Sequence, residues 1–257
     1  MRELSPATVK RRRWSITNFA AFVAPMPILD ADSALIEEWL SGFRAARTRH
    51  AYRSDLNSFY DWAKRRRLLA SSPVDEVGAI KVPKQLPHPV PAHMVETIIA
   101  TAPGRKLRTG LALAAYAGLR SAEACKLTPA DVSLEAGVIA VRDGKGAKDR
   151  MIPLHPALPA ILAEHSGTGP YVGATSHWLS CEAGKHLRSL GLAQHRLHHL
   201  RATFATELAR VTNGNLLLVG AALGHESPST TKGYVLVAMA GGADLSAAVQ
   251  RLYPHAA

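Results

Sequence analysis

The proline-rich segment at residues 81–91, KVPKQLPHPVP, limits the architecture of this 257-residue chain more than any other feature. Proline has no backbone N–H to donate, so four prolines in so short a stretch exclude a continuous helix or a central strand. This composition indicates an extended linker. The chain is long enough for a hydrophobic core on each side of the linker. We therefore expect two domains, at residues 1–80 and 92–257.

Residues 1–80 have apolar side chains at helical spacing, interrupted by prolines and by polar capping residues. A serine followed by proline is typical of a helix start, because the serine caps the helix and proline suits its first position. The pattern predicts a small bundle of four helices, the last of them short, with apolar faces inward. The expected starts are at Ser5-Pro6, near Asp32, near Thr48 and at Ser72-Pro73.

Residues 92–257 are also mainly helical, with one short exception. Two strand-like segments enclose a glycine- and aspartate-rich stretch, which favours an antiparallel hairpin. The chain is therefore predicted to be mainly α, with one small antiparallel sheet in the second domain. The expected helices cover 92–101, 105–117, 121–127 and much of the chain after Pro156, and the strands cover 137–142 and 150–154 around the turn at 143–149.

The net charge is +11, and both parts of the chain contribute to it. Lys and Arg outnumber Asp and Glu by 15 to 9 in residues 1–92 and by 16 to 11 in residues 93–257. A basic run is often only a solvated surface, but three such clusters in one small bundle favour contacts with the phosphates of a nucleic acid. The candidate phosphate contacts are Lys10, Arg11, Arg12, Arg13, Arg44, Arg47, Arg49, Arg53, Lys64, Arg65, Arg66 and Arg67.

The sequence gives little support for a metal site, a disulfide framework or a membrane span. Cys125 and Cys181 fit neither a CxxC nor a zinc spacing, and they suggest a reducing compartment. The twelve histidines include no HExxH motif or Cys/His cluster, so we expect no metal site and no cofactor. No apolar run has the length of a membrane span, and the first residues do not open a signal peptide. We expect an intracellular protein.

Several short motifs in the second domain carry residues that suit attack on a phosphodiester. GLRSAE holds Arg120, LHHLRATFAT holds His198 and Arg201 three residues apart, and LGHESPSTTKGY places His225 nine residues before Tyr234. Guanidinium groups bind the non-bridging oxygens, imidazoles move protons, and a phenol is a nucleophile. Each motif alone has a structural explanation, such as an ion pair or a core tyrosine. Their combination favours catalysis.

In order and flanking residues, these motifs resemble the tyrosine recombinase, or phage integrase, family. The resemblance implies catalytic roles for Arg120, His198, Arg201 and His225, with Tyr234 as nucleophile, and a supporting role for Glu123. It implies that Lys145, in the turn GKGAKDR, protonates the leaving 5′ oxygen. Lys148, in the same turn, is the alternative for this role and is also expected to contact DNA. Two positions depart from the common pattern. His199 doubles the histidine, although the spacing favours His198, and Ala202 stands where many members carry histidine.

The resemblance also implies the fold and the reaction. It predicts a SAM-like core-binding bundle joined to an integrase catalytic domain, in a Xer-like or minimal phage enzyme without a preceding arm-site domain. The implied activity is site-specific DNA recombination through a 3′-phosphotyrosine bond and a Holliday junction. The implied partners are duplex attachment sites, a homotetramer and an accessory bending or directionality factor, in a bacterial host cytoplasm.

Three alternatives to phage or mobile-element integration stay open at this point. A Xer-type recombinase would resolve chromosomes or plasmids, a type IB topoisomerase would relax supercoils as a monomer, and a DNA-binding regulator would keep the fold without catalysis. The apolar stripe of Leu245, Ala248, Val249 and Leu252 predicts a tail helix after Tyr234. That helix is expected either to cap its own domain or to dock on a neighbouring subunit.

Overall fold

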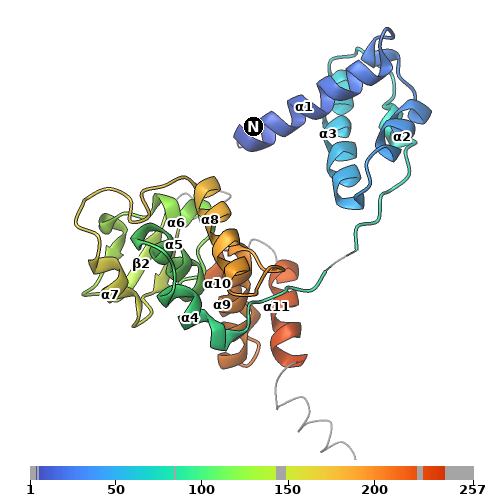
Figure 1. Ribbon diagram of the computed structural model, residues 1–257. Helices are drawn as coiled ribbons and strands as arrows, with labels where there is room; N and C mark the ends of the chain where they lie inside the picture. Colours follow the sequence, from blue (N-terminus) through green and yellow to red (C-terminus); the bar gives the residue numbers. More distant parts are fainter. Residues whose placement is uncertain (1–3, 5, 84, 143–148, 225–227, 241–257) are drawn as a thin grey trace, which may run out of the picture. The chain divides into compact units, whose positions relative to one another are not determined.

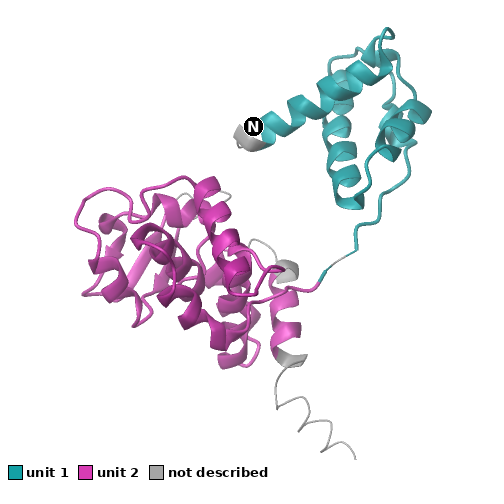
Figure 2. Ribbon diagram, in the orientation of Figure 1, with its two compact units in different colours: residues 1–85 teal, residues 86–257 magenta. Residues whose placement is uncertain are grey.

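The computed structural model describes residues 4, 6–83, 85–142, 149–224 and 228–240, and it separates the chain into two compact units (Figure 2). Unit 1 is Met1–Gln85 and unit 2 is Leu86–Ala257. The boundary lies within the proline-rich segment 81–91, where four positions have no backbone donor. Val90, near the end of this segment, is already buried in the core of unit 2.

Unit 1 is built from three helices: α1 (Pro6–Val23), α2 (Ser33–Ser41) and α3 (Ala46–Arg65) (Figure 1). The side chain of Asp32 accepts a hydrogen bond from the backbone N–H of Leu35 and so caps α2, as the sequence predicted. The helices bury an aromatic and aliphatic core that includes Phe19, Ile36 and Tyr60. The apolar positions at helical spacing thus face inward.

The short fourth helix expected at Ser72-Pro73 is instead a single 3-10 turn, Pro73–Asp75. The Ser72 side chain caps this turn by accepting from Val74 N. Val74 O accepts the backbone N–H of Val77 at 3.2 Å, and Arg53 Nη2 donates to Val74 O at 3.2 Å and to Val77 O at 2.7 Å. The Arg53 bonds attach this turn to α3.

Unit 2 surrounds its largest hydrophobic core with helices and carries a small sheet at one side (Figure 1). The three strands are antiparallel in the order β1-β2-β3, with Val138 opposite Pro153 and Val141 opposite Arg150. The predicted hairpin is confirmed, and β1 is an additional strand. The elements are α4 (Val95–Ala100), α5 (Arg105–Tyr116), α6 (Ser121–Lys126), β1 (Val132–Ser133), β2 (Val138–Val141), β3 (Arg150–Pro153), α7 (Leu158–Ala163), α8 (Ser176–Ser189), α9 (Leu197–Val211), α10 (Leu216–Leu223) and α11 (Pro228–Ala240), with 3-10 turns at Ala92–Met94 and Pro129–Asp131.

Two glycines allow the backbone to pass close to other groups near the ends of these helices. Gly118, just before α6, has φ 61°, and a Cβ there would lie 2.4 Å from the Phe204 ring. Gly224 follows α10 with φ 62°, and a Cβ there would lie 3.1 Å from the Arg150 side chain. Both positions require glycine for conformation and for space. Among the described residues, no helix is both long and apolar enough to cross a membrane.

Candidate active site

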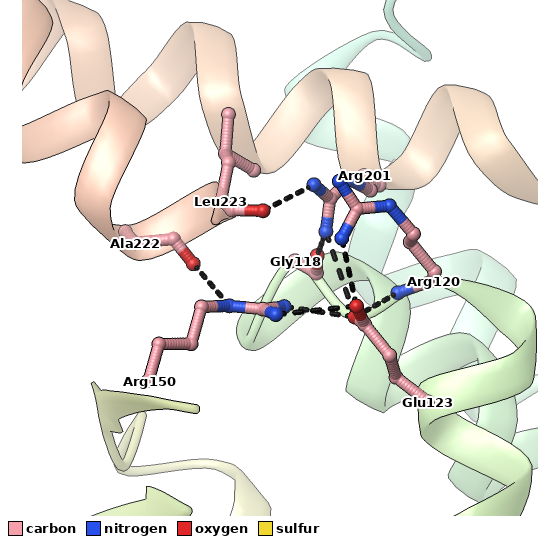
Figure 3. Close-up of polar contacts among 7 residues, drawn as sticks. All are labelled: Gly118, Arg120, Glu123, Arg150, Arg201, Ala222 and Leu223. Carbon is pink, nitrogen blue, oxygen red and sulfur yellow. Dashed lines mark hydrogen bonds and ion pairs between the residues drawn. The ribbon is translucent and has the colours of Figure 1, made fainter. Parts of the chain in front are cut away.

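The carboxylate of Glu123 lies at the centre of a group of three arginines (Figure 3). Arg120 Nη1 donates to Glu123 Oε1 at 2.7 Å. Arg150 approaches as a fork, with Nη1 at 3.1 Å from Oε1 and Nη2 at 2.8 Å from Oε2. Arg201 Nη1 lies 3.8 Å from Oε2. One carboxylate therefore orients three guanidinium groups that come from distant parts of the sequence.

The local sequence explains why Glu123 sits where it does. Arg120 precedes the first turn of α6, and Glu123 Oε2 accepts the backbone N–H of Arg120 at 2.8 Å, as in a capping box. The same carboxylate then binds the Arg120 side chain. A carboxylate in the first turn also complements the positive end of the helix. The spacing of Arg120 and Glu123 thus fixes both a helix start and the direction of a guanidinium.

Arg150 and Arg201 also donate hydrogen bonds to backbone carbonyls at the C-terminal end of α10 (Figure 3). Arg201 Nη2 donates to Leu223 O at 2.7 Å, and Arg150 Nε donates to Ala222 O at 3.0 Å. Arg201 Nη1 also donates to Gly118 O. The last carbonyls of a helix have no partner within it and carry its negative partial charge. These carbonyls therefore stabilise two buried cations.

Burial and charge act against each other in this group. Burial raises the pKa of Glu123, but hydrogen bonds from Arg150 and Arg120 outweigh it and bring the pKa to about 2. Burial lowers the pKa of Arg201 to about 10, and the positive charge of Arg120 contributes. Glu123 and Arg201 are therefore charged near neutral pH. Three cations facing one anion leave an excess of positive charge, which suits a bound phosphate.

A cavity of about 580 Å³ opens beside these arginines. Arg120 and Arg201 line it together with His198 from α9 and Tyr234 from α11. Tyr234 is half-buried, and it packs against the small hydrophobic cluster between α9, α10 and α11. The predicted residues Arg120, His198, Arg201 and Tyr234 thus converge on one cavity, whose lining is completed by Leu119, Ser121, Ser180, Arg196 and Leu197.

The two adjacent histidines of α9 have different surroundings. His198 lines the cavity, where burial and then the charge of Arg196 lower its pKa. His199 is outside the lining, and its Nδ1 accepts the backbone N–H of Arg196 at 3.2 Å. The arrangement agrees with the spacing argument that favoured His198 over His199. Ala202 is buried in α9 and does not line the cavity.

Three predicted site residues lie outside the described part of the chain, namely Lys145, Lys148 and His225, and so does the tail stretch that holds Leu245 to Leu252. Sequence reasoning also missed Arg150, whose guanidinium makes two hydrogen bonds to Glu123. A signal for it existed, because Arg150 shares a strand face with Ile152, which is buried. A cation on the inward face of a strand needs a buried partner.

The basic residues of unit 1 are not all available to a ligand. Arg11 makes a fork to the buried carboxylate of Asp55, at 3.0 Å from Nε and 2.8 Å from Nη2, and Arg12 Nε lies 3.6 Å from the same group. Arg53 is held by backbone carbonyls, and Lys64 lies 3.4 Å from Asp75. The exposed members of the predicted set are Lys10, Arg13, Arg44, Arg47, Arg65, Arg66 and Arg67, whereas Arg49 is half-buried.

Comparison with known proteins gives a consistent result. The model of the phage integrase family matches residues 90–240. Tyrosine recombinase XerC of Rhodospirillum centenum is 32% identical over 91% of this chain and 78% of its own length. Tyrosine recombinase XerD of Ralstonia nicotianae is 31% identical over 75% of this chain and 70% of its own length.

Solved structures share the fold at lower identity. A lambda integrase dimer bound to a COC′ core site aligns with a TM-score of 0.76 and 20% identity, over 91% of this chain and 72% of that one. XerH recombinase bound to a palindromic difH substrate aligns with a TM-score of 0.72 and 20% identity, over 95% of this chain and 78% of that one.

Proposed function

This chain belongs to the phage integrase family and is a site-specific DNA recombinase; we propose that Tyr234 is the nucleophile that cleaves its DNA site. One observation carries this proposal most directly. Tyr234, His198, Arg120 and Arg201 line the same cavity, although α11, α9 and the start of α6 are far apart in the sequence. A phosphate in that cavity would meet two oriented guanidinium groups and a phenol.

The reaction that we propose is a transesterification at phosphorus. The Tyr234 Oη forms a bond to phosphorus, the bond to the 5′ oxygen breaks, and a 3′-phosphotyrosine link results. The phenolic proton passes to an imidazole, for which His198 and His225 are the candidates, and the leaving oxygen takes a proton from Lys145. Arg120 and Arg201 stabilise the charge that develops on the phosphorane oxygens. The covalent link keeps the bond energy, so the balance requires neither ATP nor a divalent metal.

A nicked suicide substrate tests the nucleophile. Wild-type protein should form a covalent protein–DNA adduct in EDTA, because the proposed chemistry uses only side chains. Tyr234→Phe should abolish the adduct and leave DNA affinity within about twofold, since the ring and its packing are retained. An adduct with the Phe variant, or loss of the wild-type adduct in EDTA, would refute the proposal.

We propose further that the enzyme works as a homotetramer on two duplexes and resolves a Holliday junction. The solved structures with this fold include a lambda integrase tetramer bound to a Holliday junction. Deleting residues 243–257 tests whether the predicted tail helix joins subunits. The truncated protein should bind one site normally but lose the synaptic complex and recombination. Efficient synapsis without the tail would remove this role from it.

The biological setting that we propose is integration and excision of phage or mobile-element DNA in a bacterial cytoplasm, with an accessory bending or directionality factor. A second setting, Xer-type resolution of chromosomes or plasmids, is favoured by the relatives named XerC and XerD. The neighbourhood of the gene separates the two settings. A flanking repeat that matches a chromosomal site indicates integration, whereas a gene without such a repeat favours resolution.

A further inference from the structure

Three histidines meet at the start of α9, outside the lining of the active-site cavity. His195 lies just before α9, His199 lies in its first turn, and His88 comes from the segment that precedes α4. One ring nitrogen of each lies within 4.8 Å of a ring nitrogen of the other two. The ring centroids are 4.8 Å apart for His88 and His195, 5.4 Å for His195 and His199, and 5.7 Å for His88 and His199.

This grouping has the spacing of metal ligands. His195, just before the N-cap residue of α9, and His199, in its first turn, come from one short stretch of the chain. His88 adds a third ligand from a remote segment. Tetrahedral zinc with Zn–N near 2.05 Å holds its nitrogens about 3.4 Å apart, so the rings would have to close by up to about 1.4 Å. His88 is exposed, and rotation of its side chain can supply that movement.

A second observation points to a ligand at the same place. His195 is 2% exposed, yet its Nδ1 has no hydrogen-bond partner among the described residues. Buried polar atoms in folded proteins are almost always paired, so an unpaired imidazole nitrogen calls for an explanation. A metal ion accepting that lone pair is one explanation. Contact among three neutral rings without a metal would leave the nitrogen unpaired.

We propose that His88, His195 and His199 bind one divalent transition-metal ion of the zinc class, with a fourth coordination position open to water. Imidazole nitrogen suits Zn²⁺, Ni²⁺ and Cu²⁺, whereas Mg²⁺ and Ca²⁺ prefer oxygen ligands. The bound ion would fasten the first residues of unit 2 to α9. That segment already touches α9, since Thr203 Oγ1 donates to Val90 O at 2.8 Å. The site is distinct from the active-site cavity, which His88, His195 and His199 do not line, although the ring centroid of His199 lies 4.1 Å from that of His198.

Calorimetric titration of the full chain with Zn²⁺, together with the visible spectrum of bound Co²⁺, tests the site. Wild-type protein should bind one ion per chain and give the intense spectrum of a low-coordinate Co²⁺ site. His88→Ala should weaken binding by at least about tenfold, a loss that removal of even an outer partner of a metal ligand produces. His88 is exposed, so this variant should keep the wild-type circular dichroism and melting temperature without metal.

A matched control separates this site from surface chelation. His177 Nε2 lies 3.6 Å from Cys181 Sγ on α8, and such a pair can also take a transition metal. The double variant His177→Ala, Cys181→Ser should keep the one-to-one site. If the double variant loses binding and His88→Ala keeps it, the metal belongs to α8 and the proposal is wrong. Absence of one-to-one binding to wild-type protein would mean that the three rings only pack against one another, and it would also overturn the proposal.

Hydrogen exchange measures the structural consequence. Zn²⁺ should slow exchange of the backbone amides in residues 86–90 and at the start of α9 in wild-type protein but not in His88→Ala. Equal exchange rates with and without the metal in wild-type protein would refute the fastening role. Adduct formation by Tyr234 in EDTA is a separate readout, so failure of the metal site and failure of the proposed nucleophile are distinguishable.

Discussion

The two units of this chain use arginine in different ways. In unit 2, Arg150 and Arg201 are each 8% exposed and are fixed by Glu123 and by helix-end carbonyls. In unit 1, Arg13 is exposed within α1, and Arg65 to Arg67 are exposed at the end of α3. Arg11 and Arg53 differ from these, because their guanidinium groups are hydrogen-bonded within the bundle, although Arg11 is still 47% exposed.

The difference separates two kinds of electrostatic work. A guanidinium whose position is fixed before DNA binds can stabilise charge at one atom without reorganisation. An exposed guanidinium attracts phosphates over a wider area and loses its effect as salt rises. Substitution in unit 2 should therefore change rates and stability at constant affinity, and substitution in unit 1 should change affinity and its salt dependence at constant rate.

Loss of an arginine that lines the active-site cavity should have the largest effect, which is on the rate of DNA cleavage. Arg120→Ala should slow cleavage of a nicked substrate by about 10²–10³-fold, the usual cost of removing one donor to a developing oxyanion. Arg66→Ala removes the same charge from an exposed position and should leave the cleavage rate of bound DNA within about twofold. Single-turnover cleavage at saturating protein measures both. Equal slowing by the two variants would break the distinction between the units.

Neutralising the carboxylate of Glu123 should have the second largest effect, which is on the stability of unit 2. Glu123→Gln leaves Arg150 and Arg201 buried without their counter-charge, which should lower the free energy of unfolding of unit 2 by about 3–5 kcal/mol. Denaturant unfolding followed by Trp178, in a variant without the tryptophans of unit 1, measures this effect. A loss below about 1 kcal/mol would show that the helix-end carbonyls alone stabilise the arginines.

The same carboxylate predicts a pH dependence. The pKa of Glu123 falls from 4.5 to about 2 on folding, so its contribution to stability is complete above the unfolded value and is lost as pH falls through the folded value. Wild-type unit 2 should therefore lose stability between about pH 5 and pH 2. Glu123→Gln should lack that part of the loss. Identical pH profiles for the two proteins would contradict the proposed charge balance.

Substitution of the exposed arginines of unit 1 should mainly change the salt dependence of DNA binding. Replacing Arg65, Arg66 and Arg67 together with glutamine should reduce the slope of log K against log salt by about two to three units. Arg53→Gln is the matched control, because its guanidinium is engaged by Val74 O and Val77 O. The control should lower the stability of unit 1 and leave the slope unchanged. A changed slope in the control, or none in the triple variant, would reverse the assignment.

The smallest expected effect concerns His198. The charge of Arg196, after burial, lowers its pKa, so Arg196→Ala should raise that pKa and move the acidic limb of the cleavage profile to higher pH. The shift should be small, since burial and not Arg196 is the larger cause. His198→Gln should remove the limb. An unmoved limb in Arg196→Ala would mean that another group controls it.

Much of the fold could be predicted from local patterns. The Asp32 cap, the helices near α5 and α6 and the β2–β3 hairpin follow from residues within a few positions of each other. The expected fourth helix at Ser72-Pro73 is only a 3-10 turn, which Arg53, some twenty residues earlier, attaches to α3. Local propensity carries no information on such a partner.

The sequence by itself determined the identities and spacings of the reacting groups. Arg120 with Glu123, His198 with Arg201, and the late Tyr234 are pairs or motifs whose members share a helix or a turn, so their relation is set by backbone geometry. Tertiary structure decided what no spacing could. It placed Arg150 against Glu123, joined Arg201 to the end of α10, and brought His88 to His195 and His199. These contacts join segments far apart in the chain, and only the packing of whole helices fixes the distance between such segments.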